Sequence, residues 1–415
     1  MDNFDAMARR AEELFLAGVA AADPGQAVAR AMEAVRADPP AKGGRWVVIA
    51  LGKAARAMAE AAIKALPGAS VLVVTNYENA VALAGAEVMA AGHPVPDDAG
   101  LAAGRAITAR LRSVQPEDRV LALISGGGSA LCPAPVPGIS LSDKAEVSRL
   151  LLGSGADIGQ MNLVRQTLSQ LKGGGWLRLS AAPVVALILS DVPGDDLRVI
   201  ASGPTVAPIG TRADAAALCR QLGIWARLPD AVRAHLDAAA PAVADLPMAR
   251  NILVGSNALS LAAMAAKGAT LAPEPLDGDV AAQAARIVAL MGQLLPGQPL
   301  AFGGETTVRL TGTGLGGRNQ ELALRVAVLA EAEGWRDPWV FLAAGTDGRD
   351  GPTKAAGAIV GPHTVTRMRA AGFDPMDVLA RNDSNPALAA AGALLIIGAT
   401  GTNVADLAVA LRGPV

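Results

Sequence analysis

Short apolar runs that end in glycine recur along the chain, and this pattern indicates an open α/β sheet. Each run has the length of a strand, and apolar positions at helical spacing follow several of them. We expect strands at residues 46–51, 71–75, 120–124, 183–189, 251–254, 339–344 and 394–397, with a short one near residue 270. We expect helices at two segments within 4–37 and at 54–66, 99–111, 143–152, 158–171, 279–294 and 319–333.

The clearest case is the apolar run 120–124, which is followed directly by Ser125, Gly126, Gly127, Gly128 and Ser129. Because glycine has no Cβ, several backbone N–H groups of such a loop can point at one phosphate or carboxylate. A tight turn between a strand and a helix is the alternative interpretation. Related glycine-rich endings recur, which favours loops that converge on a ligand; they lie at residues 51–53, 302–305, 315–318 and 345–348.

The length of the chain predicts two domains. A chain of 415 residues exceeds what one ordinary hydrophobic core organises. No strand that ends in glycine is expected between residues 206 and 247, where helices and Pro-rich connections are predicted instead. We therefore predict a first domain at residues 1–245 and a second at residues 246–415.

Charge and composition narrow the class of partner to a small soluble ligand. The formal net charge is -2, aromatic residues make up 3%, and no dense Lys/Arg block occurs, so neither nucleic acid nor an anionic membrane surface is expected as a partner. The apolar runs are shorter than the ~20 residues that a membrane span needs. The only cysteines, Cys132 and Cys219, form neither a disulfide framework nor a zinc pattern. Because no apolar signal core follows the N-terminus, we expect a cytoplasmic protein.

Three polar side chains stand where a ligand could use them. Lys53 lies at the start of a predicted helix, where the helix dipole favours anions, so it suits an anionic ligand or is a solvated first-turn lysine. Asp191 follows the strand 183–189, a position that serves catalysis, metal binding or the capping of a turn. Lys172 ends a predicted helix, where a cation suits the dipole and could also reach a cleft.

Several common nucleotide motifs are absent. The chain has no Gly-x4-Gly-Lys-Ser/Thr segment and no protein-kinase catalytic loop. Residues 312–317 imitate a dinucleotide fingerprint, but they follow a short polar strand and lack the acidic residue ~20 positions later. We therefore expect neither a P-loop nor a dinucleotide site.

Phosphoryl transfer needs only positioning and electrostatics, and the chain supplies the parts. Lys53 and Arg318 are the natural cations for phosphate or carboxylate. Asp347 and Asp350 lie on a glycine-rich loop and could hold Mg²⁺ directly or through water. Asp191 is the best residue to accept the proton of a substrate hydroxyl.

The motifs together resemble one family along the whole chain. In order they are Leu51-Gly52-Lys53-Ala54-Ala55, Gly92-His93-Pro94-Val95-Pro96, Ser125-Gly126-Gly127-Gly128-Ser129, Lys172-Gly173-Gly174, Ser190-Asp191-Val192-Pro193-Gly194-Asp195, Gly203-Pro204-Thr205, Gly303-Gly304-Glu305-Thr306-Thr307, Gly316-Gly317-Arg318-Asn319-Gln320-Glu321, Gly345-Thr346-Asp347-Gly348 and Thr400-Gly401-Thr402-Asn403. This series resembles the glycerate 2-kinase family with a MOFRL-type C-terminal domain.

The resemblance implies a kinase that uses ATP and Mg²⁺ to make 2-phosphoglycerate from D-glycerate. It also implies a Rossmann-like N-terminal domain and a smaller α/β C-terminal domain, with the active site in the cleft between them. Lys53 and Arg318 match the proposed catalytic pair of the family. Their neighbours would be residues 125–129, Lys172, Asp191, Glu305, Asn319, Glu321 and Asp347. The number of subunits is left open, with a monomer and a homodimer as the alternatives.

Two other function classes stay open. Members of the family often carry the label hydroxypyruvate reductase, which would require NAD(P), and a non-catalytic sensor of glycerate or nucleotide would bind without turnover. The chain also departs from the family pattern, which bears on substrate choice and catalytic strength. Arg165-Gln166-Thr167 stands where Arg-Lys-His is usual, Lys354 where an acid is usual, Arg381 where Asn is common and Ala399 where Pro is usual.

Overall fold

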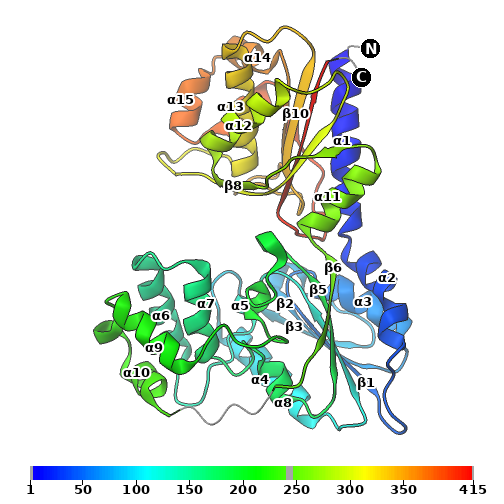
Figure 1. The fold of residues 1–415 in the computed structure, drawn as a ribbon, viewed down its shortest axis with the longest axis vertical. Helices are drawn as coiled ribbons and strands as arrows, with labels where there is room; N and C mark the ends of the chain where they lie inside the picture. Colours follow the sequence, from blue (N-terminus) through cyan, green and yellow to red (C-terminus); the bar gives the residue numbers. More distant parts are fainter. Residues whose placement is uncertain (1–2, 240–245, 414–415) are drawn as a thin grey trace. The chain divides into compact units, whose positions relative to one another are not determined.

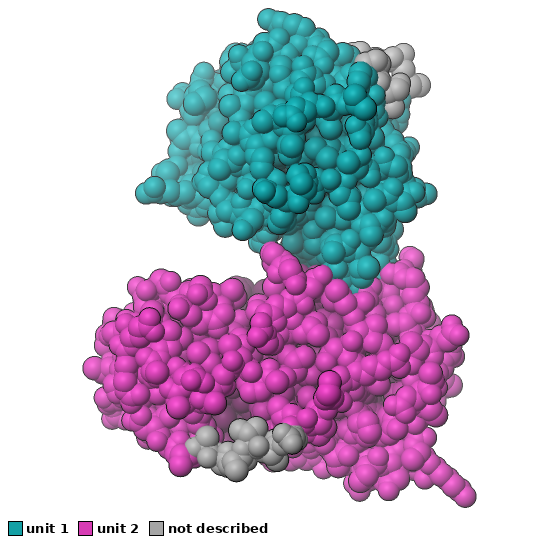
Figure 2. Space-filling view, in the orientation of Figure 1, with its two compact units in different colours: residues 1–23, 255–415 teal, residues 24–254 magenta. Residues whose placement is uncertain are grey.

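The computed structural model describes residues 3–239 and 246–413, which form two compact units (Figures 1 and 2). Unit 2 comprises residues 24–254, and unit 1 comprises residues 1–23 together with 255–415. The boundary expected at residue 245 lies outside the described residues. The described chain passes from one unit to the other between Val254 and Gly255, and the first helix belongs with the C-terminal half instead of with residues 24–254.

Unit 2 is built on a six-stranded sheet (Figure 1). The strands are β1 (Trp46–Leu51), β2 (Ser70–Asn76), β3 (Ala86–Ala91), β4 (Arg119–Ile124), β5 (Val184–Leu189) and β6 (Arg250–Gly255). They lie in the order β3-β2-β1-β4-β5-β6, and the first five of them pair in parallel. The order reverses between β1 and β4, which makes this a doubly wound sheet with its switch point at these two strands.

Helices cover both faces of this sheet, which explains the continuous apolar strands. Val47 and Ile49 of β1 pack in one core with Trp176, while the alternate residue Val48 is also fully buried. The helices of unit 2 are α2 (Pro24–Arg36), α3 (Ala55–Ala65), α4 (Asp98–Ser113), α5 (Gly128–Leu131), α6 (Leu141–Gly153), α7 (Ile158–Thr167), α8 (Gly175–Leu179), α9 (Arg212–Gln221) and α10 (Asp230–Asp237). Short 3-10 turns lie at Tyr77–Asn79, Pro193–Asp195, Ile200–Ser202 and Trp225–Arg227.

Helix α7 is shorter than the helix predicted for residues 158–171. It ends at Thr167, because the next residues bond to the proline-rich segment after α5 instead of continuing the helical ladder. The N–H of Gln170 donates to the carbonyl of Ala134 at 2.9 Å, and Ser169 forms an isolated antiparallel bridge with Pro135. Lys172 therefore lies beyond the helix, in a buried turn, and not on a helix end.

Unit 1 contains a mixed sheet of seven strands. They are β7 (Thr270–Leu271), β8 (Leu276–Asp279), β9 (Leu300–Thr307), β10 (Trp339–Gly345), β11 (Gly357–Val360), β12 (Leu394–Leu395) and β13 (Asp406–Arg412). The order is β12-β11-β10-β13-β9-β7, with β8 also paired to β9. The pairs from β12 to β9 are antiparallel, whereas β7 and β8 run parallel to β9.

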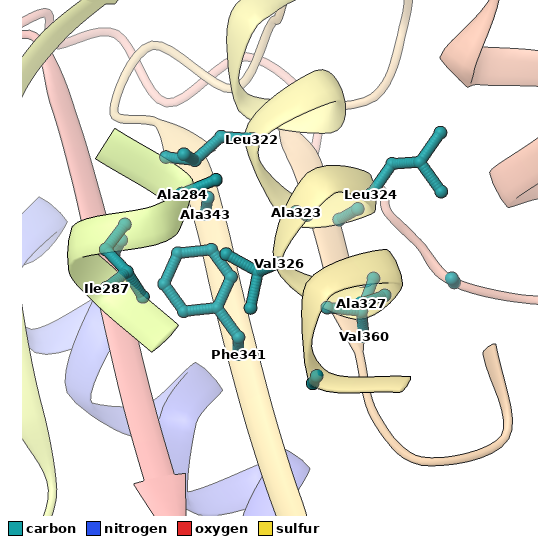
Figure 3. Close-up of a cluster of buried hydrophobic side chains, with 14 of the residues drawn as sticks. Ala284, Ile287, Leu322, Ala323, Leu324, Val326, Ala327, Phe341, Ala343 and Val360 are labelled. Atoms are coloured by element: carbon teal, nitrogen blue, oxygen red, sulfur yellow. The ribbon is translucent and has the colours of Figure 1, made fainter. Parts of the chain in front are cut away.

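Two helical layers cover the sheet of unit 1 (Figure 1). Its helices are α1 (Asn3–Ala21), α11 (Asn257–Ala266), α12 (Val280–Met291), α13 (Arg318–Ala332), α14 (Thr364–Ala370), α15 (Pro375–Ala380) and α16 (Ser384–Ala390). Phe341 of β10 packs beside Ile287 of α12 and Val326 of α13 (Figure 3). The adjacent residue Val340 faces the other way, into a core with Met7 of α1. This packing explains why α1 belongs to unit 1.

The predicted α/β class with two domains is confirmed, and most predicted strands lie within one or two residues of their observed bounds. Sequence reasoning missed β3, β8, β11 and β13 and noted β9 only through its glycine-rich ending at residues 302–305. Of these, β13 lies in the middle of its sheet, between β10 and β9. No helix among residues 3–239 and 246–413 is long and apolar enough to cross a membrane.

Candidate active site

In unit 2 the predicted residues gather at the carboxyl ends of β1 and β4, where the strand order reverses. The register pairs Leu51 with Ile124, the last residues of the two strands. The chain leaves both strands at the same edge of the sheet, and the N–H of Lys53 donates to the carbonyl of Gly126 at 2.9 Å. Ligands of open α/β sheets bind at such a switch point.

Asp191 follows β5 and packs directly on the glycine loop. A Cβ built on Gly126 would lie 2.0 Å from Oδ2 of Asp191, so only glycine fits while the carboxyl keeps this position. Burial raises the pKa of Asp191, whereas its own backbone N–H and the charge of Lys53 lower it. The net shift is upward, which suits a group that must accept a proton.

Lys53 and His93 flank the next glycine of the loop. A Cβ on Gly127 would lie 3.1 Å from Cδ2 of His93 and 3.2 Å from Cγ of Lys53. Burial and the charge of Lys53 lower the pKa of His93, so its imidazole is mostly neutral at pH 7. The ammonium of Lys53 makes no hydrogen bond or ion pair with any other residue that the structure describes. It is therefore available to a ligand.

The loop backbone adds further donors beside Lys53. The N–H groups of Gly126 and Gly127 donate to no acceptor within the described chain. Successive free N–H groups next to a lysine form a concave surface that suits an anion. The two N–H groups and Lys53 are donors of the kind that the predicted anion-binding loop at residues 125–129 requires.

A chain of hydrogen bonds runs away from the far end of the loop. Nζ of Lys172 donates to Oγ of Ser129 at 2.6 Å and to its carbonyl at 3.0 Å. Ser129 and Ser202 lie 3.0 Å apart through their hydroxyls, and Ser202 donates to Oδ1 of Asn162 at 2.9 Å. Because Ser202 uses its only hydroxyl proton on Asn162, Ser129 must donate to Ser202 and accept from Lys172.

The environment of Lys172 disfavours its positive charge. The side chain is buried, and burial is the main reason why its pKa lies well below the ordinary value. The charges of Lys144 and Arg165 lower this pKa further, whereas the nearby Cys132 raises it.

In unit 1 the expected residue Arg318 opens helix α13 and is held by two acids. Its Nε and Nη2 donate to the carboxylate of Asp406 at 2.6 and 3.0 Å. Its Nη1 lies 2.6 Å from Oε1 of Glu305. Burial lowers the pKa of Arg318, but the hydrogen bonds and charge of Asp406 and the charge of Glu305 outweigh it, so the net shift is upward. Two guanidinium N–H groups remain for a ligand.

Asp406 is a site residue that sequence reasoning missed. It is the first residue of β13, where the register places it between Gly304 of β9 and Gly345 of β10. It is almost fully buried, and burial raises its pKa while Arg318 lowers it. The signal was present, because an acid precedes the apolar run 407–411.

Asp350 has a structural task at the start of α13. Its Oδ1 accepts from the backbone N–H of Asn319 at 3.1 Å, and its Oδ2 accepts from the N–H of Gln320 at 2.8 Å. The side chains of the same two residues also donate to this carboxylate. Asp350 thus satisfies N–H groups that the first turn of a helix leaves open.

Glu321 lines a separate pocket of unit 1. Its Oε1 accepts from Arg325 at 2.8 Å and its Oε2 from Nδ2 of Asn382 at 3.1 Å. The pocket has a volume of about 310 Å³, and Arg318, Glu305 and Asn319 are not among its lining residues. The remaining lining residues are Asp279, Val280, Arg309, Thr311, Met376, Leu379 and Ala380.

The described residues offer limited means to hold a metal. They contain no group of three or more His, Cys, Asp or Glu side chains placed to do so. Asp347, the second expected metal ligand, is half-buried, and its Oδ1 accepts from the N–H of Arg349 at 2.9 Å. Its charge raises the pKa of Asp406, so it lies near the Arg318 cluster.

The glycines that imitate a dinucleotide fingerprint serve packing. A Cβ on Gly312 would lie 2.4 Å from the carbonyl of Arg381, and one on Gly314 would lie 2.5 Å from the same atom. Gly317 approaches Asp350 in the same way, at 2.3 Å from Cγ. These glycines thus make room for protein atoms.

Family models match both halves of the chain. Residues 10–237 match the family described as "Domain of unknown function (DUF4147)", and residues 299–406 match the MOFRL family. The first match covers more than half of the chain and contains the residues around Gly126.

Individual relatives match over nearly the whole length. A protein of Agrobacterium vitis named "Putative hydroxypyruvate reductase" is 42% identical over 96% of this chain and 93% of its own. The D-glycerate 2-kinase of Thermotoga maritima is 38% identical over 98% of this chain and 99% of its own. A crystal structure of glycerate kinase from Thermotoga maritima superposes with a TM-score of 0.89 at 36% identity, covering 98% of this chain and 100% of that one.

Proposed function

This chain belongs to the glycerate kinase family, and from this membership and the site geometry we propose that it transfers the γ-phosphoryl group of ATP to the C2 hydroxyl of D-glycerate. The family makes the chain an enzyme of the phosphotransferase class. The product of the proposed reaction is 2-phosphoglycerate, and Mg²⁺ accompanies the nucleotide.

The main observation behind the proposal is that two side chains approach the same loop: a lysine without a partner among the described residues, and a carboxylate that can accept a proton. Lys53 and Asp191 approach adjacent glycines, Gly127 and Gly126, at the switch point of the sheet. In phosphoryl transfer the protein positions the reactants and neutralises charge, and these two side chains can do both. Asp191 accepts the proton of the attacking hydroxyl, and Lys53 stabilises the charge on the transferred group.

The remaining donors have supporting roles in this proposal. The free N–H groups of Gly126 and Gly127 hold an anionic oxygen beside Lys53. Arg318 contributes its two unused N–H groups to phosphate, while Asp406 and Glu305 fix the plane of its guanidinium.

Mg²⁺ fits this chain as an ion that the nucleotide brings with it. In kinase sites the ion is bound by phosphate oxygens and by one or two carboxylates, without a cage made of protein alone. Asp347 fits that task, because its Oδ2 accepts no hydrogen bond from the described residues. Asp350 does not fit it, because both of its oxygens cap α13. When bound, the ion supplies positive charge to the phosphate oxygens.

A coupled assay tests the reaction and the position of phosphorylation. Purified protein is incubated with D-glycerate, ATP, MgCl₂ and enolase, which converts 2-phosphoglycerate to phosphoenolpyruvate. We expect ADP and phosphoenolpyruvate to form together. If phosphoenolpyruvate appears only after phosphoglycerate mutase is added, the hydroxyl at C3 is the acceptor; if no ADP is released, the kinase proposal is wrong.

Lys53→Ala tests the proposed role of the lysine. Loss of one preorganised charge at the reacting group should lower kcat roughly 10²- to 10³-fold. Lys64→Ala is the matched control, because Lys64 is exposed and pairs only with Glu60 on α3. Equal kcat values for the two variants would remove Lys53 from the mechanism.

The name of the Agrobacterium vitis relative calls for a reductase assay on the same preparation. Hydroxypyruvate is added with NADH and then with NADPH, without ATP. We expect no oxidation of either cofactor, because the glycines of residues 312–317 pack against protein atoms. Oxidation at a rate comparable to kinase turnover would favour the reductase.

A further inference from the structure

Three cationic side chains gather behind the glycine loop of unit 2 without a counter-ion. Lys144 and Arg165 both act on the charge of Lys172, and Arg165 also acts on Lys144. Nζ of Lys144 donates only to two carbonyls, those of Pro133 at 2.6 Å and Leu168 at 3.3 Å. No carboxylate in the described part of the chain forms an ion pair with any of the three cations.

Arg165 is the member of this cluster that has no partner. Its guanidinium carries five N–H donors, and none of them bonds to a residue of ranges 3–239 and 246–413. The side chain is half-buried on α7, and burial lowers its pKa. A half-buried guanidinium whose donors meet no acceptor in the described chain is open to solvent on one side, where a ligand can reach it.

A second donor without a partner in the described chain lies on the same face of the helix. Asn162 is 2% exposed, and its Oδ1 accepts from Ser202. Its amide NH₂ donates to no described residue. Because Asn162 precedes Arg165 by three positions, their side chains are neighbours on α7. Two neighbouring side chains thus present N–H groups toward a position where the protein supplies no acceptor.

The charges of the cluster point to the kind of ligand. Like charges repel strongly where water is excluded, so the charged forms of Lys144, Arg165 and Lys172 disfavour one another in the ligand-free protein. An anion removes that repulsion and satisfies the open donors. The planar fork of an arginine matches the two oxygens of a carboxylate.

We propose that Arg165, Asn162 and Lys172 form a subsite for the carboxylate of the acid substrate. This inference rests on the proposed function, which requires a hydroxy acid near Asp191. Lys172 bonds to Ser129 of the same glycine loop whose Gly126 contacts Asp191. A hydroxy acid bound along this loop would have its acid group at Arg165 and its hydroxyl toward Asp191. The subsite explains how the enzyme would reject uncharged polyols.

Steady-state kinetics of the full-length protein test this subsite. Arg165→Gln should raise the KM for D-glycerate roughly 10- to 100-fold, the usual effect of losing a hydrogen-bonded charge contact. The KM for ATP should change less than about twofold, and Arg165→Lys should recover part of the loss. Arg149→Gln on α6 is the matched control, because Arg149 is exposed and pairs with Glu146.

The outcomes separate this inference from the kinase proposal. A rise in the KM for ATP instead of D-glycerate would assign the cluster to nucleotide phosphate and overturn the inference. Unchanged KM values would also overturn it. If the wild type has no kinase activity, calorimetry still decides: the wild type should bind D-glycerate and not its uncharged amide, and Arg165→Gln should bind neither.

Thermal unfolding without ligand provides a readout that a structural role would not give. Removing one of three unpaired cations relieves repulsion, so Arg165→Gln should have a higher Tm than the wild type. Addition of D-glycerate should raise the Tm of the wild type more than that of the variant. A lower Tm of the free variant, with unchanged KM values, would make Arg165 a structural residue and end the proposal.

Discussion

Arg318 donates two hydrogen bonds to Asp406, although the two residues lie 88 positions apart in the chain. The arginine opens α13 and the acid opens β13, so one contact ties the start of a helix to the centre of the sheet. The geometry of this guanidinium is therefore fixed by the packing of unit 1 before any ligand binds. Electrostatic catalysis requires charged groups that are held in place in this way before the substrate binds.

Asp406→Asn tests this contact. The substitution keeps the shape but removes the charge, so the free energy of unfolding should fall by about 2 kcal/mol and kcat should fall with it. Asp377→Asn makes the same chemical change at an exposed position of α15 and should alter neither quantity. Urea unfolding and the coupled assay measure the two effects. A variant as stable and active as the wild type would show that the pair is unimportant.

Gly126→Ala tests the approach of the loop to Asp191. The added methyl group would lie 2.0 Å from the carboxylate, so loop or carboxyl must move. A displacement near 1 Å at the reacting groups costs roughly 100-fold in kcat. Gly153→Ala is the control, because a Cβ there meets nothing within 4 Å. Normal kcat in Gly126→Ala would argue against a role of Asp191 in the reaction.

Asp191→Asn should abolish the acidic limb of the pH profile. A base acts only when deprotonated, so kcat/KM of the wild type should fall as the pH drops through the pKa of Asp191. Because burial raises that pKa, the limb should lie above the pH expected for an ordinary aspartate. The variant should lose roughly 10²- to 10⁴-fold in kcat and show no such limb. Retention of the same limb would identify another base.

Asp191→Asn should lower kcat but raise the stability of the folded protein at pH 7. Folding raises the pKa of Asp191, so its protonated form stabilises the native state, and this stabilisation is lost as the pH rises through the native pKa. At pH 7 the wild type carries a buried charge that Asp191→Asn lacks. The variant should therefore be the more stable protein at pH 7, and the difference should disappear at acid pH in urea unfolding. A less stable variant at pH 7 would contradict the raised pKa.

Asp347→Asn and Asp350→Asn separate a metal contact from a helix cap. Asp347→Asn should raise the Mg²⁺ concentration for half-maximal activity roughly tenfold, which corresponds to about 1.4 kcal/mol. Asp350→Asn should instead lower the free energy of unfolding by about 1 kcal/mol, because it weakens the cap of α13. A Mg²⁺ titration and urea unfolding of both variants measure these effects. The reverse pattern would make Asp350 the metal ligand.

Local pattern was enough to predict most elements and the loop at their centre. The run 46–51 and the run 120–124 were recognised as strands because strands buried on both faces are continuously apolar. The glycines after these runs indicate a loop whose backbone other atoms can approach closely. The structure places Lys53 and Asp191 beside that loop.

Local pattern is less informative where a polar residue has a partner far along the chain. The spacing of Asp350 from Asp347 predicts a metal ligand and gives no sign that its carboxylate caps α13. Arg165 lies within the predicted helix 158–171, and its position there does not distinguish it from a solvated arginine. Only the fold reveals that its charge acts on Lys144 and Lys172 and that none of the three forms an ion pair with an acid in the described part of the chain.

The sequence by itself determined the α/β class, most strands and helices, and the loop 125–129, because these follow from periodicity and from backbone freedom over a few residues. The tertiary structure alone decided that α1 joins the C-terminal half, that β13 lies at the centre of its sheet, and that Asp406 holds Arg318. Each of these depends on contacts between residues far apart in the chain, and their free energy comes from packing and charge that no local window contains.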